Sequence, residues 1–169
     1  MEITPHPLVY QLRFARSEFM RCLEGVSPED AVKRVMPMNC ISWTVGHLAS
    51  QEHYLWVMWA QGQNLAPGLV DLVGYGKPAS TPPLADMLDA WQLITGAADR
   101  YLETLTSEIL ITYLKRGDRT ASENVGTWLQ RNIYHYWFHI GEMHAAREML
   151  GHQNLPEFVG DFGKAAYSA

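Results

Sequence analysis

Apolar residues recur along this chain at three- and four-residue spacing, the pattern of helices that bury one face. The pattern is clearest over residues 8–26 and 84–105, where no proline interrupts it. Two further helices are predicted over residues 42–61 and 120–150. Four such segments are typical of an all-α protein, and we expect a four-helix bundle.

Polar residues and glycines mark the ends of the second and fourth predicted helices. Ser42 is the expected N-cap of the second helix, because its hydroxyl can accept an orphan backbone N–H. Thr120 and Glu123 form a capping-box pattern at the start of the fourth helix. Gly62 and Gly151 follow the two helices and can adopt the left-handed conformation that closes a helix.

The connection over residues 62–82 is unusually long for a compact domain and is rich in glycine and proline. At about 3.3 Å per residue it can run the full length of a bundle. We therefore expect a long crossover that makes the second and third helices parallel. The same segment could line the mouth of a site, and the two uses are compatible.

Three shorter segments complete the chain. Ser27 followed by Pro28 predicts a short helical turn after the first helix. The pattern over residues 107–119 fits either a short helix or a strand that turns at Gly117. The segment after Gly151 is too apolar to be free, and we expect it to pack across the bundle.

Length and charge limit the classes of function. The chain has 169 residues, so we treat 1–169 as a single domain. Its net charge of −5 argues against nucleic-acid binding, which needs a concentrated basic face. No apolar run approaches membrane-spanning length, and charges interrupt the first twenty residues where a signal peptide would be apolar. We expect a cytoplasmic protein that binds neither nucleic acid nor membrane.

The two cysteines do not resemble a catalytic or metal-binding pair. Cys22 lies on the apolar stripe of the first helix, which indicates a buried and inert thiol. Cys40 is far from Cys22 in the sequence, and no C-x-x-C pattern occurs. We therefore expect neither cysteine to be a nucleophile.

Three histidines are candidates for a metal site. His135 and His139 are four residues apart, so they lie about 40° apart around one helix and on successive turns. Glu142 follows on nearly the same face, whereas His144 is rotated about 140° away from His139. His47 lies on the mostly apolar face of the second helix. Spacing alone leaves two interpretations open: a metal site, or core histidines that are simply hydrogen-bonded.

Several known classes of site are excluded by their missing motifs. The segment H-Y-W-F-H lacks the glutamate of the H-E-x-x-H zinc proteases, and no Glu-x-x-His pair of the di-iron bundles occurs. The C-x-x-C-H motif of c-type haem is absent, as are glycine-rich phosphate loops and G-x-S-x-G.

Three stretches together resemble the DinB-like superfamily of metal-dependent enzymes. S-W-T-V-G-H-L-A-S-Q-E-H-Y-L-W (42–56) is similar to the motif of that family's second helix. H-Y-W-F-H-I-G-E (135–142) resembles its H-x-x-x-H-x-G-Q motif, and L-P-E-F-V-G (155–160) resembles its usual tail. The resemblance covers essentially the whole chain, including the helix order and the long connection.

The resemblance implies a four-helix bundle with one divalent metal ion bound by His47, His135 and His139. Glu142 stands where the family commonly has glutamine. Its role is left open between a catalytic base, a fourth ligand and an acceptor for the N–H of a ligating imidazole. Tyr54, Gln51 and Asn132 are expected on the faces of their helices that point to the site.

The family's known activities imply a transferase or hydrolase that uses a low-molecular-weight thiol on a small-molecule substrate. Zinc, nickel, iron and manganese are all admissible, and small bundles of this family often form homodimers. The alternative is a stress-related or binding bundle whose metal is structural or incidental. An ion beside an open pocket favours the enzyme; an ion sealed under Trp128, Met58 and Tyr54 favours the binding bundle.

Overall fold

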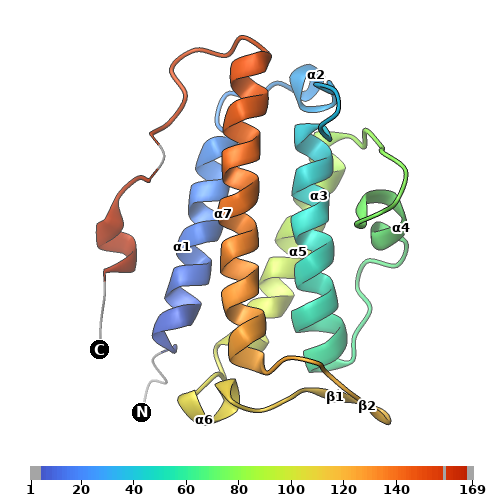
Figure 1. The fold of residues 1–169 in the computed structure, drawn as a ribbon, viewed down its shortest axis with the longest axis vertical. Coiled ribbons are helices and arrows are strands. Elements are labelled where there is room, and N and C mark those ends of the chain that lie inside the picture. The colour runs from blue at the N-terminus through green and yellow to red at the C-terminus, as the bar shows by residue number, and fades with distance from the viewer. Residues whose placement is uncertain (1–4, 158, 167–169) are drawn as a thin grey trace.

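Four long helices form a bundle in the computed structural model, which describes residues 5–157 and 159–166 (Figure 1). They are α1 (Pro7–Cys22), α3 (Ile41–Glu52), α5 (Leu84–Leu102) and α7 (Val125–Met149). α1 packs against α7, α7 against α3, and α3 against α5. α3 and α5 both run downward in Figure 1, so the predicted all-α bundle and its long crossover are confirmed. No helix in the described ranges has the length and apolar character needed to cross a bilayer.

α3 continues without a break into a π-helical segment, η1 (His53–Trp59). Together the two cover most of the helix predicted to end near residue 61. The hydrogen bonds of a π-helix span five residues instead of four, which widens the helix, and such segments are frequent at functional sites. The apolar periodicity over residues 42–61 does not indicate this change.

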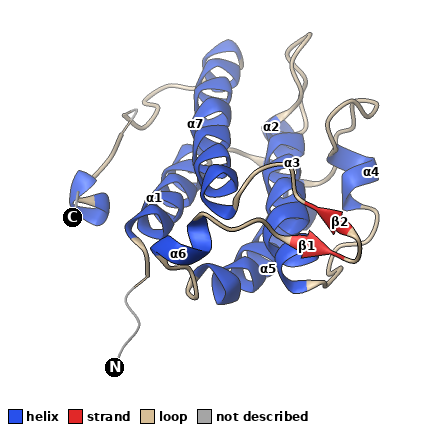
Figure 2. Cartoon of the chain, turned by 60° about the horizontal axis from the view of Figure 1, so that its bottom comes forward, coloured by secondary structure: helices blue, strands red, loops and turns tan. Residues whose placement is uncertain are grey.

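Short elements connect the long helices. α2 (Pro28–Ala31) is the turn predicted after Ser27, and α4 (Leu69–Val73) interrupts the crossover, which was predicted without a helix. The ambiguous segment contains both alternatives: α6 (Ser107–Leu110) is helical, and β1 (Lys115–Arg116) pairs antiparallel with β2 (Arg119–Thr120) (Figure 2).

The predicted N-caps of two long helices are wrong. The N-cap residue of α3 is Cys40, two residues before the predicted one, and Ser42 lies buried inside the helix. Thr120 belongs to the β-hairpin, so the cap of α7 is Asn124, whose side chain accepts the backbone N–H of Thr127 at 2.8 Å.

The C-terminal tail lies along α1, as the apolar sequence after Gly151 predicts (Figure 1). Its 3₁₀ turn, η2 (Phe162–Ala165), places the Phe162 ring 5.8 Å from the ring of Phe14. The backbone N–H of Gly160 donates to Glu18 at 2.8 Å.

A buried ionic network crosses the centre of the bundle. The Arg16 guanidinium on α1 donates to both carboxylate oxygens of Glu52 on α3 and, at 2.7 Å, to Asp99 on α5. The hydroxyl of Tyr136 on α7 donates to Glu52 at 2.6 Å and accepts the indole N–H of Trp91 at 2.8 Å. Residues of all four long helices therefore join one hydrogen-bond network around the buried Glu52 carboxylate.

Replacing Glu52 should destabilise the protein strongly. Glu52→Gln leaves the Arg16 charge buried without its main counterion, which costs on the order of 3 kcal/mol. The measurement is urea unfolding of the metal-free protein. Glu103→Gln is the matched control, because Glu103 pairs with Arg13 at the surface and its loss should cost less than about 1 kcal/mol. Equal losses in the two variants would contradict this role for the network.

Candidate metal centre

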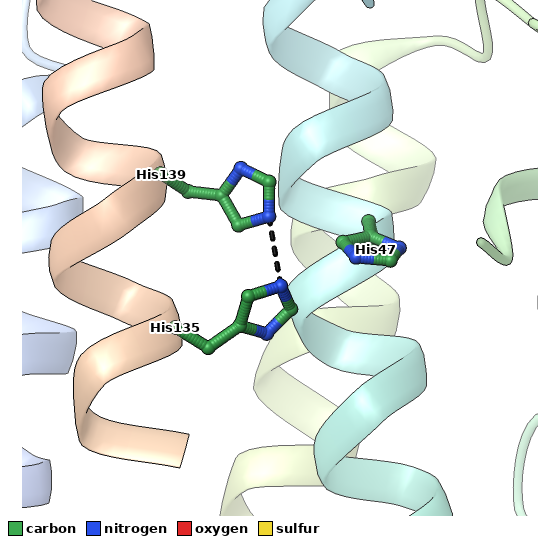
Figure 3. Close-up of side chains that lie close together, drawn as sticks. All are labelled: His47, His135 and His139. Carbon is green, nitrogen blue, oxygen red and sulfur yellow. Dashed lines mark hydrogen bonds between the residues drawn. The ribbon is translucent and has the colours of Figure 1, made fainter. Parts of the chain in front are cut away.

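Two neighbouring helices bring the three predicted histidines together (Figure 3). His47 projects from the middle of α3, and His135 and His139 project from successive turns of α7. One ring nitrogen from each histidine can be chosen so that all three lie within 4.8 Å of one another. The ring centroid of His47 is 5.0 Å from that of His135 and 5.2 Å from that of His139.

Each of the three imidazoles has an oxygen partner at Nδ1. The Nδ1 of His47 lies 2.9 Å from the carbonyl oxygen of Val73, and that of His139 lies 2.6 Å from a carboxylate oxygen of Glu142. The Nδ1 of His135 contacts the amide oxygen of Gln51. A ring that donates its Nδ1–H in this way keeps a lone pair on Nε2, which is the arrangement of histidines that ligate metals.

The spacing of the Nε2 atoms fits a shared cation. The Nε2 atoms of His135 and His139 are 2.9 Å apart (Figure 3). Two lone pairs at this distance repel unless a proton or a metal ion lies between them. Three neutral imidazoles that converge in this manner suit zinc, nickel, iron or manganese, and their number leaves coordination positions for other ligands.

Burial keeps the three imidazoles neutral. Desolvation, with a smaller contribution from the neighbouring histidines, lowers the pKa of His139 to about 3 and that of His135 to about 4. Desolvation also lowers the pKa of His47, although its bond to Val73 opposes the shift. Burial raises the pKa of Glu142. At neutral pH, therefore, protons do not compete for the ligand nitrogens.

Gly46 allows the crossover to approach His47. A Cβ at this position would collide with the sulfur of Met87 and would lie 3.2 Å from a methyl of Val73. The close packing of α4 on α3 places the Val73 carbonyl beside the imidazole of His47. The Trp43 ring stacks on the imidazole of His47, with the two ring centroids 4.5 Å apart.

Two cavities meet at the histidines. The larger, of about 1050 Å³, is lined by His47, His135 and Gln51 and extends under the crossover. The smaller, of about 470 Å³, is lined by all three histidines and Glu142. The site is thus open on two sides.

The other residues expected at the site divide into two groups. Gln51 and Tyr54 line the larger cavity as predicted. The prediction for Asn132 is wrong: its side chain is buried and its Oδ1 accepts the indole N–H of Trp56 at 2.7 Å. His144 points away as predicted, and its Nε2 lies 3.2 Å from the sulfur of Cys22.

Sequence reasoning missed two groups near the site. His53, which is not among the predicted site residues, is buried, and its Nε2 accepts the backbone N–H of Leu65 in the crossover. The Val73 carbonyl carries no signal in the sequence, because every residue has one.

Comparison with known families agrees with this geometry. The sequence model of the DinB superfamily matches residues 11–143, a range that contains all three histidines and Glu142. The chain belongs to the DinB superfamily. A search of curated proteins found no match.

The bundle also matches a solved structure of the same superfamily. A DinB-like protein from Bacillus subtilis superposes with a TM-score of 0.61 over 92% of this chain and 99% of that one. The two sequences are 17% identical, so the likeness concerns the fold. The match agrees with a DinB-like fold for this chain.

The lowered pKa values predict that zinc affinity resists acid. Because protons bind His135 and His139 only as the pH falls toward 4, affinity should change little between pH 7.5 and 5.5 and fall below about pH 5. Competition with a chelator of known protonation constants measures this. A hexahistidine peptide is the reference, since ordinary imidazoles with pKa near 6.5 lose affinity from about pH 7 downward. The same decline in both would contradict the prediction.

Proposed function

We propose that this DinB-superfamily protein is a metal-dependent enzyme that uses one divalent ion and a low-molecular-weight thiol. The observation that carries the proposal is the convergence of three histidine rings, one ring nitrogen of each within 4.8 Å of the others, at the junction of two cavities. Each ring also has an oxygen partner at Nδ1. His47, His135 and His139 are the proposed ligands. When bound, a divalent ion supplies the positive charge that lowers the pKa of a thiol or water molecule toward neutrality.

The chain's own residues orient the site and handle protons. Glu142 accepts from the Nδ1 of His139 at 2.6 Å, and its side chain is 43% exposed, so it touches both the imidazole and the smaller cavity. This contact supports a positioning role for Glu142, which fixes the tautomer and direction of the His139 ring. Gln51 does the same for His135, and Val73 for His47.

The reacting thiol comes from outside the chain. Burial raises the pKa of Cys22 to about 11, so at neutral pH it is a protonated thiol and a poor nucleophile. Cys40 is 1% exposed and its sulfur contacts the hydroxyl of Ser42 at 3.3 Å. The larger cavity has the volume to admit a diffusible thiol next to the histidines.

The alternative is a binding bundle with a structural or incidental metal. It would require the ion to be sealed under Trp128, Met58 and Tyr54. Instead, Met58 and Tyr54 form part of the cavity wall, and Trp128 packs against the rings of Tyr54, Trp56 and Trp59. This arrangement favours the enzyme.

Metal content tests the ligand assignment. Wild-type protein without a histidine tag should hold one divalent ion per chain. His47→Ala, His135→Ala and His139→Ala should each lower the affinity by more than the roughly 10- to 100-fold expected from losing an outer hydrogen-bond partner. Elemental analysis after dialysis measures this. His144→Ala is the control and should retain full occupancy; full occupancy in His47→Ala would refute the site.

Glu142→Gln separates positioning from base catalysis. The glutamine amide oxygen can still accept the Nδ1–H of His139 but cannot take a proton. We expect metal content to be retained and the rate of thiol transfer to an aryl chloride to stay within about threefold of wild type. A loss of about 100-fold would instead assign Glu142 as the base. If no small thiol binds or reacts, the binding bundle replaces the enzyme.

A further inference from the structure

α7 carries opposite charges on the two sides of the histidine pair. Arg131 lies four residues before His135, which places it one turn away, about 6 Å along the axis and about 40° around it. Glu142 lies three residues after His139. The two charged groups line different cavities: Arg131 the larger one and Glu142 the smaller one.

The larger cavity is polarised by this arrangement. Apart from its histidines, Arg131 is the one ionisable cation among the described residues of the lining, and no carboxylate of those residues lies there. The remaining walls include the aromatic rings of Tyr54, Tyr134 and Phe138 together with aliphatic, small and uncharged polar residues. A ligand that fills this space meets apolar surface along its length and a positive charge at the end away from the histidines.

Glu123 holds the Arg131 guanidinium in place. Its carboxylate accepts from the Nε of Arg131 at 3.0 Å and from one Nη2 hydrogen. These two bonds use two of the five N–H groups of a guanidinium. Exposed ion pairs contribute little to stability, so the pair serves better to orient the cation than to hold the fold. A guanidinium fixed along one edge can present its other edge to a planar carboxylate.

We infer that the larger cavity selects a thiol that carries a carboxylate. The inference rests on the proposed function. The carboxylate binds Arg131, the body of the thiol packs against Tyr54, Tyr134 and Phe138, and the sulfur lies at the three histidines. The helical rise sets the distance from sulfur to carboxylate on the order of 6 to 9 Å. The smaller cavity does not take this anion, because Glu142 lies there.

Two matched thiols test the inference with cobalt-loaded full-length protein. 4-Mercaptophenylacetate and 4-mercaptophenylacetamide have the same size and differ in charge, and a sulfur-to-cobalt charge-transfer band reports binding of either. The acid should bind about tenfold more tightly, equivalent to about 1.4 kcal/mol. Arg131→Gln should abolish that advantage without changing the affinity of the amide or the cobalt content.

Two controls separate a direct contact from a general charge effect. Arg100→Gln removes the same charge from α5 at a position that lines neither cavity, and the acid should keep its advantage there. Mercaptoacetate is too short to span the distance, so its affinity should be equal in wild type and Arg131→Gln. Equal dependence of the short and long acids on Arg131 would overturn the contact.

The remaining outcomes distinguish this inference from the proposed function. Equal binding of acid and amide in wild type, or an advantage that survives Arg131→Gln, overturns the inference alone. Absence of the charge-transfer band for both thiols in cobalt-loaded protein refutes the thiol function. In that case, calorimetry measures the affinities of phenylacetate and phenylacetamide for metal-free wild type and for metal-free Arg131→Gln. A preference for phenylacetate that depends on Arg131 would show that the cavity still selects an anion.

Discussion

The carboxylate of Glu52 is fully buried at the centre of the bundle, and an ion there is tolerated only when its hydrogen bonds and charge are satisfied. Arg16 on α1 and Tyr136 on α7 bond to this carboxylate directly. Asp99 on α5 joins the network by accepting from Arg16. A shift of one helix along its axis would break this network. Because Tyr136 follows His135 directly, the same constraint fixes the height at which the histidines of α7 face α3.

The fold was largely predictable because it depends on repeated local signals. The apolar stripes defined the long helices, and the length of the 62–82 connection predicted its crossover. The errors fall where tertiary contacts override local preference. Thr120 has the sequence of a cap but pairs with Lys115 in the hairpin, which leaves the cap of α7 to Asn124. Neither the π-helical turn nor α4 has a distinct periodicity.

The candidate site was predictable in its side chains and not in its surroundings. The spacing of His135 and His139 places both on one face of a helix, whereas pairing them with His47 required the register between α3 and α7. The resemblance to DinB-like proteins supplied that register. Asn132 was misassigned because its position on the helix is close to the site, but the buried indole of Trp56 requires its oxygen.

The bond between His47 and the Val73 carbonyl has a consequence for how the site tolerates change. The acceptor belongs to the main chain, so a substitution at position 73 that fits the pocket over Gly46 leaves it in place. An insertion or deletion between Gly62 and Val73 would move it, whatever residues are kept. Among related chains, the length of this part of the crossover is therefore a better guide to the orientation of His47 than the identity of residue 73.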